Sequence, residues 1–570
     1  MKKLLVFLKD YKKETVFAPL FKMLEAGFEL FVPLVMAAVI DRGIAQSDIS
    51  YVLKMGLVLV ALGLIGLTCS ITAQYFAAKA AVGFSTQMKH ALFAHIQSLS
   101  FSEMDTLGTS TMITRMTSDA NQVQNGVNMV LRLFLRSPFI VFGAMVMAFT
   151  IDVKAALVFV VTIPLLSIVV FGIMMITMPL YKKVQASLDK VLGKTRENLT
   201  GVRVIRAFHK EEQETEEFEQ GNQTLTHMQL FVGKISALTN PVTYIIINVA
   251  TIVLIYTGAV QVDTGYITQG EVVALVNYMS QILIELVKLA NLIITITKAL
   301  ACANRIENVF ALESSMEWKA PHDGSKKQDA YAVEFEHVCL TYQGAGAESL
   351  SDIDFKVEKG ETVGIIGGTG SGKSSLVHLI PRFYDASKGS VRIDGIDVKD
   401  YGMEQLRNKI GMVMQKAVLF QGSIEDNLRW GKQDASAQEL EEALRIAQAK
   451  DVVDSKPKGL KERIAQGGKN LSGGQRQRLT IARAIVKKPE ILILDDSASA
   501  LDYATDARLR KAIREMEGKT TVFIVSQRTS SIQYADKIIV LEDGKVAGIG
   551  THEELLTSCE VYQEIHYSQS

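Results

Sequence analysis

The sequence predicts an α-helical membrane domain with six transmembrane helices, fused to a soluble α/β domain that carries a phosphate-binding loop. Long apolar runs fill residues 1–312, polar and turn-forming residues follow them, and a Gly-rich segment at residues 367–375 separates an apolar run from a helix-like run. Hydrophobic residues make up 48% of the chain and the mean hydropathy is +0.18, but the apolar runs are concentrated in the first half. This uneven distribution is typical of a membrane protein with an attached soluble domain.

Composition limits the classes of partner and cofactor. The formal net charge is +0 and the isoelectric point is about 7.1, so no general positive field argues for a nucleic-acid partner. The four cysteines lie far apart without a CxxC pair, which indicates neither a disulfide framework nor a zinc site. The length of 570 residues requires at least two domains.

A helix needs about 20 mainly apolar residues to cross the hydrocarbon core of a bilayer. Six segments of the first half meet or approach this length. The third segment is short, and to cross the bilayer it must include part of residues 127–135. The predicted spans lie near residues 17–40, 52–78, 137–151, 155–180, 236–260 and 270–297.

The distribution of positive charge predicts the orientation of these spans. The connections after spans one, three and five carry at most one Lys or Arg each, whereas the stretches after spans two and four are rich in both. By the positive-inside rule, both termini are cytoplasmic in a multi-pass protein of the cell membrane. Residues 1–9 carry a short apolar run with no small-residue cleavage site, so we interpret them as an amphipathic elbow helix at the cytoplasmic face.

The stretches after spans two and four are too long to be simple loops. Residues 181–233 are charged but helically periodic, and two helices of about 25 residues would extend the spans by ~40 Å into the cytoplasm. We expect the turns of these two hairpins, near residues 101–114 and 202–213, to contact the soluble domain. A charged hairpin that is only solvated is the alternative.

Ionisable residues in the spans allow two interpretations. Glu25 and Glu29 share a helix face with Lys22, and such charges are costly in a bilayer unless they face water or a partner charge. Either of these carboxylates could offer a counter-charge to a cationic cargo. The alternative is ion pairing with Lys22, Arg132 or Lys288, which would hold the helices in register.

Residues 313–329, ESSMEWKAPHDGSKKQD, switch to polar and turn-forming types and mark the end of the last span. We therefore expect a transmembrane domain at residues 1–312, a linker at residues 313–330 and a soluble domain at residues 331–570.

The Gly-rich segment fits the pattern GxxxxGK[ST] between a strand and a helix. Glycines allow the backbone N–H groups to point inward, and the N-terminus of the following helix favours negative charge. Lys373 would reach the outer phosphates and Ser374 a Mg²⁺ ion, so the segment predicts a nucleoside triphosphate site. The residues expected to bind the nucleotide are Gly367, Gly368, Thr369, Gly370, Ser371, Gly372, Lys373, Ser374 and Ser375.

Three further features match this chemistry. Tyr342, about 25 residues ahead of the loop, can stack on an adenine ring. The apolar run at residues 488–496 ends in Asp495, which we expect in the Mg²⁺ shell, and Asp496, which we expect to orient the attacking water. A second helix start suited to a phosphate is the LSGGQ segment, with Ser472, Gly473, Gly474 and Gln475.

On these motifs the sequence resembles the ATP-binding cassette (ABC) family over nearly its whole length. The resemblance implies an exporter-type half-transporter with ATPase activity, which binds ATP and Mg²⁺ and places each ATP between the phosphate loop of one chain and the LSGGQ segment of a second. It also implies a catalytic and Mg²⁺-binding role for Gln415. The matching segments are Tyr342 (A-loop), Gly367 to Ser374 (Walker A), Gln415 (Q-loop), Leu471 to Gln475 (signature), Ile491 to Asp495 (Walker B) and Ser499 to Asp502 (D-loop).

Two positions depart from the family pattern. Asp496 stands where the family has a catalytic Glu, and Gln527 stands where it has a switch His. The shorter carboxylate sits about one bond farther from the water, and Gln cannot exchange a proton at neutral pH as imidazole can. Because the signature is intact, the pattern resembles the degenerate-site subunit of heterodimeric bacterial multidrug exporters. It implies a different partner chain that supplies the catalytic Glu and His, with hydrolysis mainly at the partner's site.

The expected cargo is an amphipathic small molecule, a drug or a lipid, taken from the cytoplasm or the inner leaflet. A lipid or peptide exporter on the same scaffold remains an alternative. So does a regulatory ATP-binding subunit that gates its partner.

Overall fold

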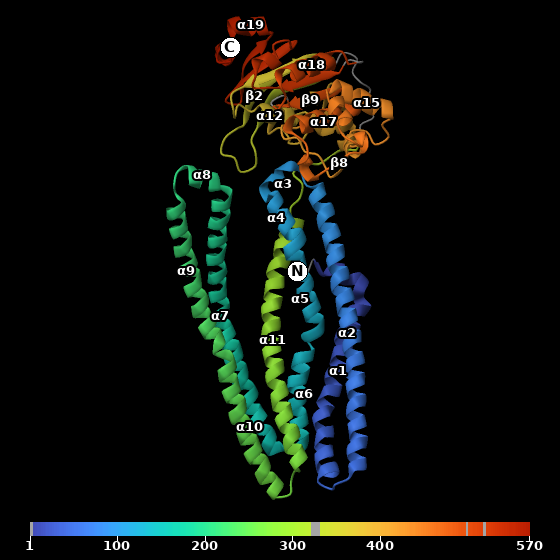
Figure 1. Cartoon of the computed structure of the whole chain (residues 1–570). Coiled ribbons are helices and arrows are strands. Elements are labelled where there is room, and N and C mark those ends of the chain that lie inside the picture. Colours follow the sequence, from blue (N-terminus) through green and yellow to red (C-terminus); the bar gives the residue numbers. More distant parts are fainter. Residues whose placement is uncertain (1–3, 321–330, 498–499, 517–519, 570) are drawn as a thin grey trace. The chain divides into compact units, whose positions relative to one another are not determined.

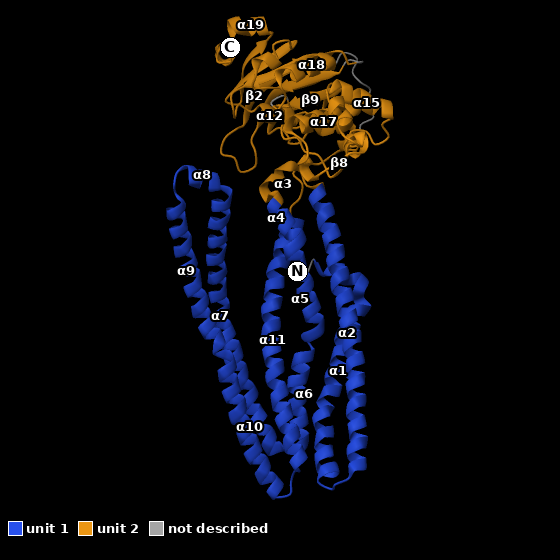
Figure 2. Cartoon of the chain, in the orientation of Figure 1, with its two compact units in different colours: residues 1–97, 110–311 blue, residues 98–109, 312–570 orange. Residues whose placement is uncertain are grey.

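A computed structural model of the chain describes residues 4–320, 331–497, 500–516 and 520–569. The chain divides into two compact units, shown in different colours in Figure 2. Unit 1 comprises Met1–Gln97 and Ser110–Ala311, and unit 2 comprises Ser98–Thr109 and Leu312–Ser570. Residues 101–109 of the first predicted hairpin turn therefore belong to the unit that contains the phosphate loop, and residues 110–114 belong to unit 1.

Unit 1 is entirely helical in its described residues, and six of its helical segments are long and apolar enough to cross a membrane, as predicted (Figure 1). The short third span is completed by stacking α5 on α6, so that the continuous segment Thr109–Ile151 has 43 residues. The first 311 residues contain η1 (Leu4–Tyr11), α1 (Lys12–Ala38), η2 (Val39–Ile44), α2 (Ile49–Ser98), α3 (Phe101–Leu107), α4 (Thr109–Thr114), η3 (Arg115–Asp119), α5 (Ala120–Leu133), α6 (Arg136–Ile151), α7 (Val153–Thr200), α8 (Val202–Ala207), α9 (Glu211–Ala237), α10 (Thr239–Asp263) and α11 (Gln269–Phe310).

Two helices are much longer than a bilayer requires. Helix α2 has 50 residues and α7 has 48, whereas about 20 residues cross the hydrocarbon core. The polar end of α7 packs along α9 through a small apolar cluster that includes Val184, Leu225 and Val232. The second hairpin is thus a packed pair of helices (Figure 1), and the contact of its turn with the soluble domain stays a prediction.

Charged side chains of three helices in unit 1 form ion pairs with one another. Arg136 of α6, only 7% exposed, binds Glu29 of α1 and Glu285 of α11, with an N–O distance of 2.6 Å to each. Glu285 also pairs with Lys288 at 2.8 Å, and Glu25 pairs with Lys22 at 2.5 Å. These contacts are those that the helix-register interpretation predicts, with one correction: the partner of Glu29 is Arg136 and not Lys22, Arg132 or Lys288.

Unit 2 is built on a six-stranded sheet of order β12-β11-β3-β10-β9-β6, in which the strands from β11 to β6 are parallel. Its other sheets are antiparallel, of order β2-β1-β4-β5 and β7-β8. The strands are β1 (Val333–Leu340), β2 (Leu350–Val357), β3 (Thr362–Gly367), β4 (Lys388–Ile393), β5 (Ile396–Asp397), β6 (Ile410–Val413), β7 (Gly422–Ser423), β8 (Arg463–Ile464), β9 (Ile491–Asp495), β10 (Thr521–Val525), β11 (Lys537–Glu542) and β12 (Lys545–Gly550).

Both faces of the six-stranded sheet are buried. Alternate residues of β9 enter two different apolar clusters, Leu492 and Leu494 on one side and Ile491 and Ile493 on the other. Such near-continuous Ile, Leu and Val runs are typical of parallel strands covered by helices. The helices after the linker are α12 (Lys373–Leu379), η4 (Val398–Asp400), α13 (Met403–Lys409), α14 (Ile424–Arg429), α15 (Ala437–Ile446), α16 (Lys450–Asp454), η5 (Gly459–Lys461), η6 (Gln466–Gly468), α17 (Gly473–Val486), α18 (Tyr503–Arg514), η7 (Thr529–Ser531), α19 (His552–Ser558) and α20 (Glu560–Tyr567).

The first turn of α11 packs against the end of α1 so closely that only glycine fits at residue 270. A Cβ there would lie 2.3 Å from the carbonyl oxygen of Ala37 and 2.6 Å from Oδ2 of Asp41. The backbone N–H of Gly270 also donates to Oδ1 of Asp41 at 2.8 Å, so α11 cannot move away from the end of α1 without losing this hydrogen bond. We expect Gly270→Ala to lower the free energy of unfolding by roughly 1–3 kcal/mol.

Thermal unfolding of the purified full chain in detergent measures this effect. Gly56→Ala is the matched control, because a Cβ at residue 56 would meet nothing within 4 Å. An equal loss of stability in the two variants would contradict the packing explanation.

Candidate nucleotide site

The site is assembled at the edge of the sheet where three parallel strands end. Val525 of β10 pairs with both Ile365 of β3 and Asp495 of β9, so the three strands end at nearly the same level. The loops that leave them carry Gly367 to Gly372, Asp496 and Gln527. The carboxyl edge of a parallel sheet is the usual place for a ligand site in α/β folds.

The loop after β3 has the backbone of an anion cradle. Gly370 and Gly372 adopt positive φ angles of +86° and +92°, which residues with a side chain rarely do. A Cβ at Gly372 would lie 2.7 Å from the Leu350 side chain and 2.9 Å from the Ser349 carbonyl oxygen, whereas a Cβ at Gly368 would meet nothing. The loop is therefore packed on one side and open on the other, and α12 begins directly after it.

Lys373 lies over this loop. Its ammonium donates hydrogen bonds to the carbonyl oxygens of Gly367 at 2.9 Å and Gly368 at 2.6 Å. Burial lowers the pKa of Lys373, while the nearby carboxylates of Asp496 and Asp495 act in the opposite direction. An anionic phosphate in the loop would provide the same kind of partner and favour the charged ammonium further.

Oxygen donors suited to a hard cation lie next to the loop. The hydroxyl of Ser374 donates to Oδ1 of Asp495 at 3.0 Å, and the side-chain amide of Gln415 donates to Oδ2 of Asp496 at 3.3 Å. Within the described residues, no group of three or more His, Cys, Asp or Glu could hold a metal ion. This donor set fits Mg²⁺, which is commonly held by one or two protein oxygens together with phosphate oxygens and water.

Asp496 occupies an unusual backbone position. Its φ is +43°, in the left-handed region, and its N–H donates to the carbonyl oxygen of Val525 at 3.1 Å. Burial raises the pKa of Asp496, the amide of Gln415 counteracts this, and the Asp495 charge adds to the rise. A strained, partly buried carboxylate beside the phosphate loop is a typical feature of a functional site.

Gln527 lies in the loop after β10, and the end of the chain holds this loop. The side-chain amide of Gln569 donates to the carbonyl oxygen of Gln527 at 2.6 Å, and its oxygen accepts from the N–H of Thr529 at 2.9 Å. The Gln527 side chain is an amide, so it can hydrogen-bond to a substrate oxygen but cannot accept a proton at neutral pH.

These groups line one cleft of about 730 Å³. The predicted residues that it brings together are Thr369, Gly370, Gly372, Lys373, Ser374, Ser375, Gln415, Asp495, Asp496 and Gln527. Tyr342 adjoins them, since its hydroxyl donates to Ser375 Oγ at 2.9 Å. Gly367 and Ser371 are buried on the packed side of the loop, and Gly368 is exposed on its open side.

The LSGGQ segment is not part of this cleft. Ser472 instead caps α17, where its hydroxyl accepts from the N–H of Gln475 at 3.2 Å. Gly473 and Gly474 form the first turn of this helix. Ser499 lies outside the described residues, and Asp502 caps α18. The predicted LSGGQ residues are thus not among those that line the cleft, and their binding of a phosphate stays a prediction.

Sequence reasoning missed one residue of the site and one wall of the cleft. His378 of α12 places Nε2 3.5 Å from Oδ2 of Asp495. His378 follows Ser374 by four residues, so both lie on one face of the helix. This spacing is the sequence pattern that could have predicted His378 as a residue of the site. The wall formed by residues 345–349 and 543–544 carries no recognisable motif.

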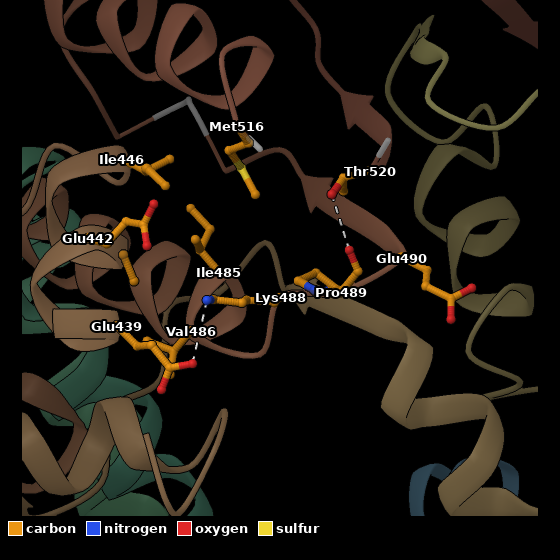
Figure 3. A pocket seen from close by; sticks show the side chains of 11 residues that line it. Glu439, Glu442, Ile446, Ile485, Val486, Lys488, Pro489, Glu490, Met516 and Thr520 are labelled. Carbon is orange, nitrogen blue, oxygen red and sulfur yellow. Dashed lines mark hydrogen bonds and ion pairs between the residues drawn. The ribbon is translucent and has the colours of Figure 1, made fainter. Parts of the chain in front are cut away.

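A second cleft of about 300 Å³ lies elsewhere in unit 2 (Figure 3). It has an apolar floor that includes Ile446 and Ile485, and Lys488 at its rim lies 3.5 Å from Glu439. It contains none of the predicted site residues, so we assign no role to it.

Comparison with known proteins gives two family matches. Residues 15–286 match the family described as ABC transporter transmembrane region, and residues 350–499 match the family described as ABC transporter. An uncharacterized ABC transporter ATP-binding protein of Mycobacterium tuberculosis is 36% identical, covering 99% of this chain and 97% of that protein. A Bacillus subtilis protein, provisionally named as a multidrug export ATP-binding/permease protein, is 33% identical over 100% of this chain and 99% of its own.

The fold also matches a solved structure. The structure of a bacterial Atm1-family ABC exporter with ATP bound superposes with a TM-score of 0.80 and covers 98% of each chain. Its sequence identity of 22% supports the fold alone.

The aromatic ring of Tyr342 beside the phosphate loop leads to a test of nucleotide binding. We expect Tyr342→Leu to weaken MgATP binding by roughly 2- to 12-fold, because an aromatic stack contributes ~0.5–1.5 kcal/mol beyond its area. Tyr342→Phe, which keeps the ring, is the matched control and should bind normally. Equilibrium titration of the full chain with a fluorescent ATP analogue measures both, and equal losses would point to the hydroxyl instead of the ring.

The raised pKa of Asp496 predicts a pH-dependent stability. The folded chain holds this proton more tightly than the unfolded chain, so the charged carboxylate destabilises the fold above its folded pKa. Asp496→Asn should therefore raise the melting temperature near neutral pH, in buffer without Mg²⁺ or nucleotide. The gain should shrink as the pH falls toward the ordinary Asp value of about 3.9. A gain that is independent of pH would contradict this explanation.

Proposed function

Because the chain belongs to the ABC transporter family and carries both its transmembrane region and its ATP-binding domain, we propose that it is the degenerate-site half of a heterodimeric exporter. The family and the six membrane-crossing segments make it a multi-pass membrane protein with an ATP-hydrolysing transporter domain. The proposal concerns the partner, the division of labour between the two sites, and the cargo.

The separation of the phosphate loop from the LSGGQ segment supports a two-chain site. Lys373 lines the cleft at the end of β3, whereas Ser472 caps α17 and lies outside that cleft. Each segment lies at a helix start, where the helix dipole favours a phosphate. Two chains arranged reciprocally would complete two such sites, with ATP between the loop of one chain and the signature of the other.

The single observation that carries the degenerate-site proposal is that Asp496 and Gln527 line the same cleft as Lys373 and Ser374. A carboxylate shortened by one carbon would stand about 1.5 Å farther from a water in the same position. Gln527 does not offer the imidazole that could exchange a proton. General-base and positioning effects of this kind contribute roughly 10²–10⁴-fold in rate, so the cleft should retain ATP longer than it hydrolyses it.

In this proposal the two sites have different tasks. Mg²⁺ would be held through Ser374, Asp495 and Gln415, and would neutralise phosphate charge. ATP retained in this chain's cleft keeps the two ATP-binding domains together, while hydrolysis at the partner's site resets the transporter. The two sites influence each other because both bind ATP best in the closed state.

The proposed cargo is an amphipathic drug or lipid that enters from the cytoplasm or the inner leaflet. The name of the Bacillus subtilis relative supports this class. The ion pairs of Glu25 with Lys22 and of Glu29 with Arg136 support a structural role for these carboxylates. Cargo selection would then depend mainly on apolar contacts.

Restoring the family residues should restore hydrolysis. We expect the purified full chain, reconstituted at concentrations where it self-associates, to hydrolyse ATP slowly. The double variant Asp496→Glu with Gln527→His should raise this rate by roughly 10²-fold, because it supplies the longer carboxylate and the imidazole. Steady-state phosphate release measures the rate.

Asp496→Asn with Gln527→His is the matched control and should stay slow, since it supplies the imidazole without a carboxylate. Brisk hydrolysis by the unmodified chain would reject the degenerate-site proposal. Purification from the native membrane with a second copy of the same chain as sole partner would reject the heterodimer.

A further inference from the structure

A further cleft of about 330 Å³ lies between α18 and the six-stranded sheet, at the sheet edge opposite to the nucleotide cleft. It is lined by Thr362, the first residue of β3, and by Val522 of β10, which pairs with Thr362. The nucleotide cleft begins where the same strand ends, at Gly367. Since a strand rises about 3.3 Å per residue, roughly 16 Å of β3 separates the two clefts. They share no lining residue.

One face of α18 forms the polar wall of this cleft. Residues 503, 507, 510 and 514 of the helix line it, and spacings of three and four place residues on one side of a helix. Three of the lining residues are basic, namely Arg510, Lys511 and Arg514, and we therefore refer to this site as the basic cleft.

Two of these basic groups are available to a ligand. Lys511 lies 3.9 Å from Glu515, but both side chains are well exposed, so this ion pair is weak. Arg514 donates a hydrogen bond to the carbonyl oxygen of Tyr534 at 3.2 Å, and among the described residues it has no carboxylate partner. Positive charge at this end of α18 is therefore only partly compensated.

The third basic group has an unused hydrogen-bond donor. Nη1 of Arg510 donates to the carbonyl oxygen of Ser530 at 2.7 Å, and Nη2 lies 3.1 Å from Oδ2 of Asp506. Its Nε is buried and has no hydrogen-bond partner in the part of the chain that the structure describes. A buried donor without an acceptor is unfavourable, so an anionic oxygen bound in this cleft could relieve that cost.

The basic cleft also offers apolar and aromatic surface. Its lining includes the buried side chains of Ile513, Val522 and Ile524. Tyr503 and Tyr534 line it as well, and they are 64% and 65% exposed. Two exposed tyrosine rings next to buried aliphatic side chains provide a surface on which a flat ring can pack.

The helix end alone does not account for this arrangement. Basic residues in the last turn of a helix interact favourably with its dipole, which is sufficient to explain Lys511 and Arg514. It explains neither the unpartnered Nε of Arg510 nor the two exposed rings that line the same cleft. Together these features are typical of a small-molecule site, with a few polar groups around an apolar surface.

We propose that the basic cleft is a second ligand site of unit 2, which binds a phosphate monoester that carries an aromatic ring. The phosphate, with up to two negative charges and three acceptor oxygens, matches the donors of Arg510, Lys511 and Arg514 better than a carboxylate would. The ring would pack on Tyr503 or Tyr534.

The size of the basic cleft limits the ligand. Its volume of about 330 Å³ lies near the lower end of the range for small-molecule sites, roughly 300–1,000 Å³, so the ligand has one ring system. This inference goes beyond the proposed function, and it depends neither on ATP binding in the nucleotide cleft nor on a second chain.

Hydrogen exchange of the full chain, titrated with phenyl phosphate as the probe, tests the inference. We expect saturable slowing of amide exchange in a peptide that covers residues 503–514. Inorganic phosphate lacks the ring and benzyl alcohol lacks the anion, so each should require at least about tenfold higher concentrations. The peptide that covers residues 367–375 reports binding at the nucleotide cleft. Lys373→Ala, which weakens that cleft, should leave the response of residues 503–514 unchanged.

Three variants make the result specific to the basic cleft. Lys511→Gln with Arg514→Gln should raise the half-saturating concentration of phenyl phosphate by about tenfold or more, because charge-assisted hydrogen bonds are lost. Tyr534→Ala, which keeps the carbonyl that holds Arg514, should weaken the binding of phenyl phosphate but not that of inorganic phosphate. Arg508→Gln is the matched control, because Arg508 is an exposed basic residue of α18 that does not line the cleft. Equal melting temperatures without ligand would show that the variants fold normally.

Each other outcome overturns the inference. If phenyl phosphate does not slow exchange in residues 503–514, or if the double variant binds it as tightly as Arg508→Gln does, the basic cleft is not a phosphate site. If benzyl alcohol is as effective as phenyl phosphate, the cleft is only an apolar hollow, and if inorganic phosphate is as effective, the ring has no role. None of these results affects the proposed function, because MgATP binding is measured separately on residues 367–375.

Discussion

The whole site depends on three parallel strands that end at nearly the same position along the sheet. Because β3, β9 and β10 are buried on both faces, their registers are set by packing, and the residues that follow them must emerge at one edge. The phosphate loop can use this edge only because residue 372 is a glycine, since a Cβ there would lie 2.9 Å from the Ser349 carbonyl oxygen. The chemistry of the cleft is therefore a consequence of sheet packing.

Local patterns made much of the fold and site predictable. The six spans follow from apolar length, and the loop at residues 367–375 follows from glycine spacing next to a strand. Tertiary partners could not be predicted in the same way. Arg136 binds Glu29 across 107 positions of sequence, and α3 groups with the soluble unit through rings at residues 101 and 383. Such contacts depend on how helices pack, which spacing alone does not reveal.

The cleft combines strain with electrostatic cost at one residue. Asp496 adopts a left-handed backbone and carries a carboxylate whose ionisation is opposed by burial and by Asp495. A residue kept under such conditions is generally held there by its function, since a neutral side chain would be more stable. In the proposed transporter this residue still positions the attacking water, even though its side chain is short. Retention of ATP and slow turnover would then be two results of a single side-chain length.

The last described residue of the chain connects two distant parts of unit 2. Gln569 uses both ends of its amide on the loop after β10, at the carbonyl of Gln527 and the N–H of Thr529. Gln569 follows the helix α20 (Glu560–Tyr567), so a displacement of this helix that broke these two hydrogen bonds would change the loop that carries Gln527.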